Sequence, residues 1–232
     1  MRRRELLMVT ALMTIAVVSA GANKPGVSKT SPRDKEPTSE VDTETDARVN
    51  PTEGLPVEAS SLISHDKVLA AAYFSTLRIL GTANGCSLFF GGPAASGEVF
   101  KQMFGKVNKG VFAAPVGIQM SGQTTNISNA FFGMEYRLFE KVTINSHGPF
   151  YRERFSRSGQ RFPRTATFEA NTNEVRVLML LHELGHVMKG EDGHWLLPDD
   201  GKDEGISRLN SQKIRDVCGE QIKALQKYEN GR

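Results

Sequence analysis

Residues 172–190 read TNEVRVLMLLHELGHVMKG, and the fold of this chain can be worked out from this stretch. From Val175 to Met188 the side chains are apolar except for Arg176 and the polar residues of the motif His182-Glu183-Leu184-Gly185-His186. A helix that is apolar on nearly all sides is buried in the centre of a domain. The stretch therefore predicts a central helix that carries two histidines and a glutamate into the core.

The ends of this helix are also marked in the sequence. Thr172 or Asn173 can cap the first turn through a side-chain oxygen, and Glu174 complements the positive end of the helix dipole. Gly190 is placed for a left-handed cap after the last turn. We therefore expect the helix to begin near residue 173 and to end before Gly190.

The motif within the helix has the spacing of a metal site. His182 and His186 are four residues apart, so they project from one helix face and can reach the same ion. Zinc accepts such nitrogen ligands in a tetrahedral site. Glu183 lies about 100° further round the helix, where its carboxylate can serve as general base toward a metal-activated water. The alternative is a pair of hydrogen-bonded core histidines with a surface glutamate. In that case no metal offsets the free-energy cost of burying these polar side chains.

With these residues the chain resembles the zincin superfamily of metallopeptidases. Together with WLLPDDG at 195–201 and SRLNSQKIRDVC at 207–218, it is also similar to small exported bacterial HExxH proteins of unassigned activity. The resemblance implies zinc-dependent hydrolysis of peptide bonds, with His182 and His186 as metal ligands and Glu183 as the catalytic residue.

The third metal ligand is less clearly marked. His194 is the preferred candidate, because it is the only imidazole downstream and two glycines before it let the chain turn back. In the metzincin pattern the third histidine stands six residues after the second motif histidine, whereas His194 stands eight residues after His186. Asp199 and Asp200 are the alternatives, by analogy with zincins that use an aspartate. Glu204 and Glu220 fit the branch with a glutamate ligand less well.

Two further residues could assist the reaction. His147 and Tyr151 follow a predicted strand, and zincins commonly bind an extended peptide along an edge strand above the metal. Either side chain could hydrogen-bond a developing oxyanion. The simpler interpretation, a solvent-facing histidine and a packed tyrosine, is favoured because nothing in the sequence positions them.

The regions around the central helix predict an α+β domain. A small antiparallel or mixed sheet packs against the buried HExxH helix, with helices flanking it on its N- and C-terminal sides. The sheet comes from short β-branched and aromatic runs after Gly110, and Pro115 places the first run at an edge or bulge. Helices are expected over 62–80, from Pro93 to Phe104, and from Gln212 to Tyr228 after a cap at Ser207 or Asn210; residues 148–170 form an irregular, basic, aromatic loop.

The N-terminal quarter predicts export. Arg2–Arg4 precede an apolar run, Leu6–Val18, that is short for the roughly 20 residues needed to span a bilayer. We therefore expect a cleaved signal peptide over 1–20 and no stable membrane insertion after its removal. Residues 21–57 are too polar to form a core and predict a disordered tether, with a propeptide as the alternative; 58–232 form the metallohydrolase domain.

The chain has two cysteines, Cys86 and Cys218. In an oxidising compartment they could form a disulfide, and the alternative is a pair of buried, inert thiols. Together with the predicted signal peptide, they suit an extracytoplasmic protein, periplasmic or secreted.

Charge excludes one class of partner. The formal net charge is +3, and Arg2, Arg3 and Arg4 against Glu5 contribute +2 of it. The remainder is close to neutral without a concentrated Lys/Arg face, so nucleic acid is not an expected partner.

These observations together predict a Zn²⁺-dependent metallopeptidase that acts on a peptide or protein substrate. One alternative is a non-catalytic envelope or binding protein stabilised by its metal, which a closed shell of four ligands would favour. Another is an amidase that acts on cell-wall material with the same metal chemistry.

Overall fold

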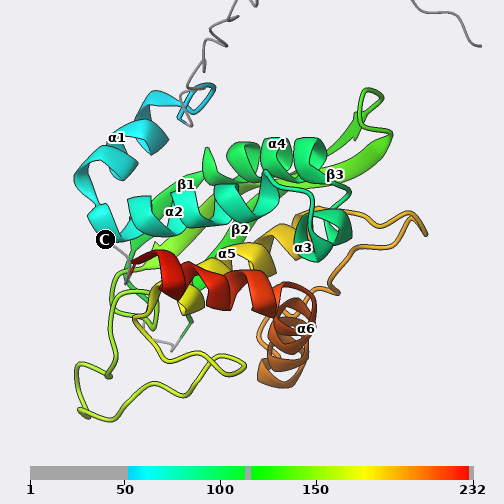
Figure 1. Ribbon diagram of the computed structural model, residues 1–232. Coiled ribbons are helices and arrows are strands. Elements are labelled where there is room, and N and C mark those ends of the chain that lie inside the picture. Colours follow the sequence, from blue (N-terminus) through cyan, green and yellow to red (C-terminus); the bar gives the residue numbers. More distant parts are fainter. Residues whose placement is uncertain (1–51, 113–115, 230–232) are drawn as a thin grey trace, which may run out of the picture. The chain divides into compact units, whose positions relative to one another are not determined.

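The computed structural model describes residues 52–112 and 116–229, all within the unit Arg48–Arg232 (Figure 1). The predicted signal peptide and the predicted tether up to residue 51 lie outside the described residues, as does Pro115. Helix α1 begins at Val57, and Leu55 before it already packs against the core.

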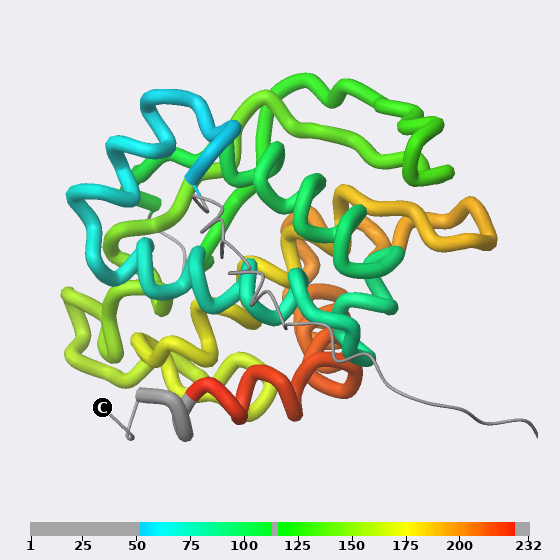
Figure 2. The backbone as a smooth tube through the Cα atoms, turned by 45° about the horizontal axis from the view of Figure 1, so that its top comes forward, coloured from blue at the N-terminus to red at the C-terminus, as the bar shows by residue number. Residues whose placement is uncertain are grey.

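Helix α5, Asn173–Val187, is the buried HExxH helix that the sequence predicts. The Thr172 hydroxyl caps it by accepting a hydrogen bond from the Val175 N–H at 3.3 Å. The helix packs between α2 and α6 and also contacts α4, β2 and β3 (Figures 1 and 2). The predicted left-handed cap at Gly190 is wrong. The helix ends at Met188, whose backbone is extended because the chain there pairs with Tyr136 of the sheet.

Two helices replace the single helix predicted over 62–80. Helix α1, Val57–His65, and helix α2, Lys67–Leu80, are separated by Asp66. Asp66 has an extended backbone, and its carboxylate caps α2 by accepting from the Leu69 N–H at 3.0 Å. An apolar pattern continues across such a break, so periodicity alone does not reveal it.

The next two helices differ in how clearly the sequence marks them. Helix α4, Pro93–Phe104, has proline in its first turn as predicted. The short helix α3, Gly85–Phe89, was not predicted. It begins with a capping box in which Asn84 and Ser87 exchange side-chain hydrogen bonds with each other's backbone.

The sheet has three strands in the order β1-β3-β2, so the predicted α+β class with a small mixed sheet is confirmed. Strand β3, Met134–Asn145, pairs in parallel with β1, Val107–Gly110, and antiparallel with β2, Ile118–Asn129. The first β-branched run after Gly110, residues 111–118, is not a strand at residues 111, 112, 116 and 117, and only its last residue, Ile118, belongs to β2. Helices α4 and α5 contact β3 directly.

Helix α6, Glu204–Glu229, begins eight residues before the predicted start at 212. Asp203 caps it by accepting from the backbone N–H groups of Gly205 and Ile206, so the predicted caps Ser207 and Asn210 lie inside the helix. Cys86 of α3 and Cys218 of α6 form a disulfide. The sequence left open whether the two cysteines are bonded, and the structure contains the bond.

One apolar core fills the space between the sheet and the helices. Its largest fully buried side chains come from α2, α4 and α5, including Tyr73, Phe100 and Phe104, whose rings contact one another. Within the described ranges, no helix combines the length and the apolar character that crossing a bilayer requires.

Candidate metal centre

The segment after α5 folds back along the helix. Met188 and Leu196 pair through the hydrogen bond from the Leu196 N–H to the Met188 carbonyl at 2.9 Å, and the chain reverses direction at Gly193, whose φ is 77°. The Leu197 N–H then donates to the carbonyl of Gly185 at 3.0 Å. This returning segment therefore carries the residues after Leu197 past the motif histidines.

Gly185 is required by this close approach. A Cβ atom at this position would lie 2.6 Å from two side-chain atoms of Leu197, which is fully buried. The glycine inside the motif thus makes room for the segment that returns over the helix.

Three ligand atoms meet at this point. The Nε2 atoms of His182 and His186 are 3.0 Å apart, and the carboxylate of Asp200 lies 3.1 Å from the first and 3.6 Å from the second. Both histidines are buried, and Asp200 is partly buried. Within the part of the chain that the structure describes, these three residues form the one group of His, Cys, Asp and Glu side chains able to hold a metal ion.

The separations between these atoms suit a zinc ion. Ligands about 2.0–2.2 Å from a tetrahedral centre stand roughly 3.3–3.6 Å from one another, and the three measured separations, 3.0, 3.1 and 3.6 Å, lie close to this range. Two nitrogen donors and one carboxylate are also the donor set of catalytic zinc sites.

The structure separates the preferred third ligand, His194, from the two motif histidines. His194 is exposed at the tip of the turn after α5 and does not belong to the group of His182 and His186. The two nearby glycines do let the chain turn back, as the sequence indicates. The turn itself places His194 outward, however, and the returning segment brings Asp200 close to the motif histidines. Glu204 and Glu220 are likewise exposed and outside the group.

Asp199, the other alternative, has a different partner. Its carboxylate forms an ion pair with Arg137, which is 9% exposed and lies on the central strand β3. The Arg137 Nε–H donates to the carbonyl of His186 at 2.9 Å, and its guanidinium carbon lies 4.2 Å from the centre of the Trp195 ring. One guanidinium thereby connects the sheet, the end of α5 and the residue next to Asp200.

Helix α6 holds the other side of the centre. The Oγ of Ser211 lies 3.0 Å from Nδ1 of His182, and the hydroxyl of Ser207 helps to lower the pKa of the Asp200 carboxyl. A ligand histidine is commonly oriented by such a bond to its second nitrogen. Nδ1 of His186 is buried and has no hydrogen-bond partner among the described residues. Its ring orientation therefore depends on packing and on contacts made through Nε2.

Glu183 follows His182 on α5 and is the candidate acid or base. The residue as a whole is partly exposed, but its carboxyl is desolvated, and this desolvation raises the pKa of the carboxyl above the ordinary value. The nearby His182 and His186 oppose this shift, and Asp200 adds to it. A carboxylate with a raised pKa is a stronger base at neutral pH than an exposed one, provided that it remains ionised.

The charges around the histidines favour a cation. Burial lowers the pKa of His186, but the nearby carboxylates of Asp200 and Glu183 outweigh this and raise it overall. Burial likewise works against ionised Asp200, yet the two histidines beside it, with Nε2 of His182 at 3.1 Å, hold the pKa of its carboxyl well below the usual range. Carboxylates that stabilise a proton on His186 also stabilise a metal ion at the same point.

The two residues considered for oxyanion binding lie elsewhere. The Tyr151 hydroxyl donates to Asp66 at the start of α2 at 2.7 Å, and the ammonium group of Lys109 lies over its ring. His147 is exposed. Neither belongs to the group of ligands, so the simpler interpretation of both residues fits the structure.

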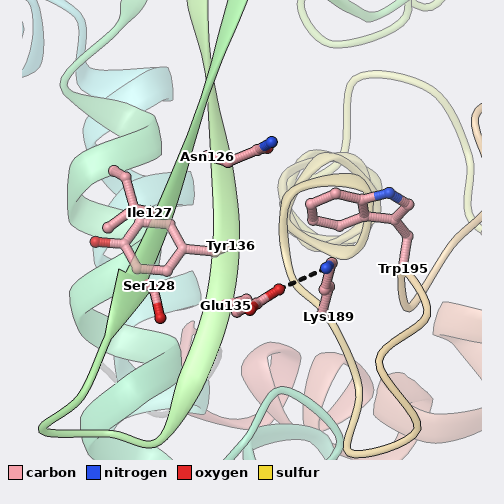
Figure 3. A pocket seen from close by; sticks show the side chains of 7 residues that line it. All are labelled: Asn126, Ile127, Ser128, Glu135, Tyr136, Lys189 and Trp195. Atoms are coloured by element: carbon pink, nitrogen blue, oxygen red, sulfur yellow. Dashed lines mark hydrogen bonds and ion pairs between the residues drawn. The ribbon is translucent and has the colours of Figure 1, made fainter.

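A groove of about 290 Å³ lies beside the returning segment (Figure 3). Trp195 and the β2–β3 hairpin stand on opposite sides of it, and a 2.5 Å ion pair joins Lys189 to Glu135. The groove does not include the three ligands, but its Trp195 wall stacks on the guanidinium that holds Asp199. It is lined by Asn126, Ile127, Ser128, Glu135, Tyr136, Lys189 and Trp195.

Two residues that shape the centre were missed from the sequence. Arg137 stands in the run Tyr136-Arg137-Leu138-Phe139, where an arginine among apolar residues could have signalled a buried charge. Ser211 offers no such signal, because its role depends on where α6 crosses α5.

Comparisons with protein-family models, with curated proteins and with solved structures find no match for this chain.

Proposed function

We propose that this protein is a zinc metallopeptidase in which His182, His186 and Asp200 bind the ion and Glu183 is the general base. The observation that carries the proposal is the convergence of two imidazole nitrogens and a carboxylate at 3.0–3.6 Å from one another. These atoms come from one helix and from a segment 14 residues further along the chain, so their meeting is a property of the tertiary structure.

The residues have separable roles in the proposed reaction. When bound, zinc lowers the pKa of a coordinated water to about 7 and polarises the carbonyl under attack. Glu183 accepts a proton from the attacking water and passes it to the leaving amine. His182 is oriented by Ser211, and Asp200 is positioned by the neighbouring ion pair of Asp199.

The number of ligands favours catalysis over a purely structural metal. Structural zinc sites are closed by four protein ligands, whereas catalytic sites have three and leave a position for water or substrate. The group found in the described residues contains three. The groove beside Trp195 is the candidate site for a side chain of the substrate.

The proposed location is outside the cytoplasm. The disulfide between Cys86 and Cys218 supports it, because such bonds persist in oxidising compartments. The predicted signal peptide points to the same place.

The test combines metal content with activity. We expect the purified protein to bind one zinc ion and to cleave members of a mixed peptide library. Glu183→Gln removes the base but none of the ligands, so turnover should fall by about 10²-fold or more while the zinc content is unchanged. Glu191→Gln makes the equivalent change at an exposed glutamate in the turn that follows α5. It is the matched control and should keep full activity.

Other outcomes would replace the proposal. Full zinc content with no cleavage of peptides or of peptidoglycan fragments would favour a metal-stabilised binding protein. Cleavage of peptidoglycan amide bonds alone would favour an amidase. Equal turnover by Glu183→Gln and the wild type would remove Glu183 from the mechanism.

A further inference from the structure

The loop between β3 and α5 contains a concentration of positive charge, although the near-neutral net charge led us to expect no concentrated Lys/Arg face. Residues 152–164 read RERFSRSGQRFPR, in which five arginines stand against one glutamate and give a net charge of +4. The whole chain has a net charge of +3, so all other residues together contribute −1. We call residues 152–164 the arginine hairpin. None of its residues belongs to the metal centre, so a role for the hairpin is independent of the proposed function.

The arginine hairpin has its own local structure. The Phe155 N–H donates to the Gln160 carbonyl, and the Phe162 N–H donates to the Glu153 carbonyl, both at 2.8 Å. Between the two strands the rings of Phe155 and Phe162 stack with centroids 4.0 Å apart. The chain reverses at Gly159, which has a φ of 68°. The yellow-green segment that includes the hairpin extends away from the helices (Figure 1).

Three exposed arginines of this hairpin, Arg154, Arg157 and Arg161, have no ion pair within the described residues. Arg154 and Arg161 are bridge partners, so their side chains lie on the same face although like charges at such positions repel. Arg154 donates only to the carbonyl of Gly159. Arg157 and Arg161 have no ion pair or side-chain hydrogen bond within the described part of the chain. A folded segment that maintains this repulsion is suited to an external anion.

The surroundings of these arginines identify the kind of anion. A guanidinium binds sulfate, phosphate or carboxylate through two parallel hydrogen bonds, and three of them fit a ligand with several such groups. Phe162 is 5% exposed and stacks on Phe155, so no free ring is offered for stacking on nucleic-acid bases. The turn at 156–160 reads SRSGQ and has no apolar side chain to enter a bilayer.

We infer that the arginine hairpin binds an anionic polysaccharide. Arg154, Arg157 and Arg161 would contact its charged groups. The exposed Ser158 and Gln160 beside them offer a hydroxyl and an amide for the sugar hydroxyls.

The test uses dextran sulfate as the probe and neutral dextran as its control. We expect the full chain to bind dextran sulfate and not dextran at physiological salt, with an affinity that falls as salt rises. The double variant Arg157→Gln/Arg161→Gln should bind about tenfold more weakly and with a shallower salt dependence. Lys141→Gln/Lys223→Gln removes the same charge from exposed sites outside the hairpin and should bind like the wild type.

Three results would overturn the inference. Equal weakening by the two double variants would show that only net charge matters. Absence of binding to dextran sulfate would remove the site. Tighter binding to anionic phospholipid vesicles or to single-stranded DNA than to dextran sulfate would assign the hairpin to a different partner. Unchanged melting temperatures and zinc contents in both variants would show that the comparison is not affected by folding.

Discussion

At the scale of single residues, the two candidates for the third zinc ligand differ in position. His194 is the better zinc ligand by chemistry, but it is exposed at the tip of a turn, whereas Asp200 lies 3.1 Å from His182. A ligand is chosen by its position as well as by its donor atom. Asp200 reaches the centre because the chain runs back along α5.

Whether Asp200 or His194 is the third ligand can be tested by comparing two variants. Asp200→Asn removes the charged donor and should weaken zinc binding at least tenfold. His194→Ala changes an exposed residue outside the centre and should leave the affinity unchanged. Both affinities can be measured by competition with a chromophoric chelator. Strong loss of zinc in His194→Ala, with retention in Asp200→Asn, would contradict the assignment.

Arg137 is the second residue whose role only the structure reveals. Its ion pair with Asp199 fixes the residue next to Asp200, so we expect it to be a positioning residue for the metal centre. Arg137→Met keeps most of the buried volume and removes the guanidinium. Zinc affinity should fall about tenfold, the lower end of the range for residues that orient metal ligands.

The control for Arg137 is a double-mutant cycle with Asp199→Asn. If the pair acts as a unit, each single variant weakens zinc binding and the double variant is little worse than either. A loss of thermal stability in Arg137→Met with unchanged zinc affinity would mean that the arginine supports the fold and not the centre.

At the scale of elements, α5 and the segment that returns over it depend on Gly185. Gly185→Ala places a methyl group 2.6 Å from Leu197, so the returning segment has to move away from the helix. We expect a loss of about 1–3 kcal/mol in the free energy of unfolding, as in other overpacked cores. Zinc binding should weaken as well, because Asp200 moves with Leu197. Denaturant unfolding and zinc titration measure the two effects.

Gly219 in α6 provides the matched control. A Cβ atom there would meet only Arg215, at an ordinary distance of 3.6 Å. Gly219→Ala should therefore be neutral or stabilising by up to about 1 kcal/mol, the difference in helix propensity. If Gly185→Ala behaves like Gly219→Ala, the close approach of the returning segment is not needed.

At the scale of the whole molecule, the disulfide joins elements that are distant in sequence. Cys86 and Cys218 are separated by 132 residues, and the bond connects α3 to α6, which contributes Ser211 to the metal centre. Closing so long a loop restricts the unfolded chain and should stabilise the fold by about 3–5 kcal/mol. Replacing both cysteines by serine should lower the urea midpoint accordingly.

Reduction of the wild-type protein provides an independent check of the disulfide. A thiol reductant should shift its unfolding midpoint toward that of the double serine variant and should not shift the variant itself. An unchanged midpoint in the reduced wild type would show that the bond is absent or contributes nothing to stability.

The sequence by itself determined the central helix, its N-terminal cap and the pairing of His182 with His186, because these depend on contacts within a few residues. It also indicated the α+β class, through the change from helical to strand-like texture along the chain. It did not reveal β2, Ile118–Asn129, because that strand is mostly exposed and polar and lacks the alternation that marks a half-buried strand.

Only the tertiary structure decided the meeting of Asp200 with the motif histidines, the contacts of Arg137 and the bond between the cysteines. Each of these depends on where a distant segment returns to the helix: Asp200 by a turn, Arg137 by the central strand, and Cys218 by α6. Local sequence patterns contain the preferences of single elements, whereas the approach of two elements depends on packing across the whole core.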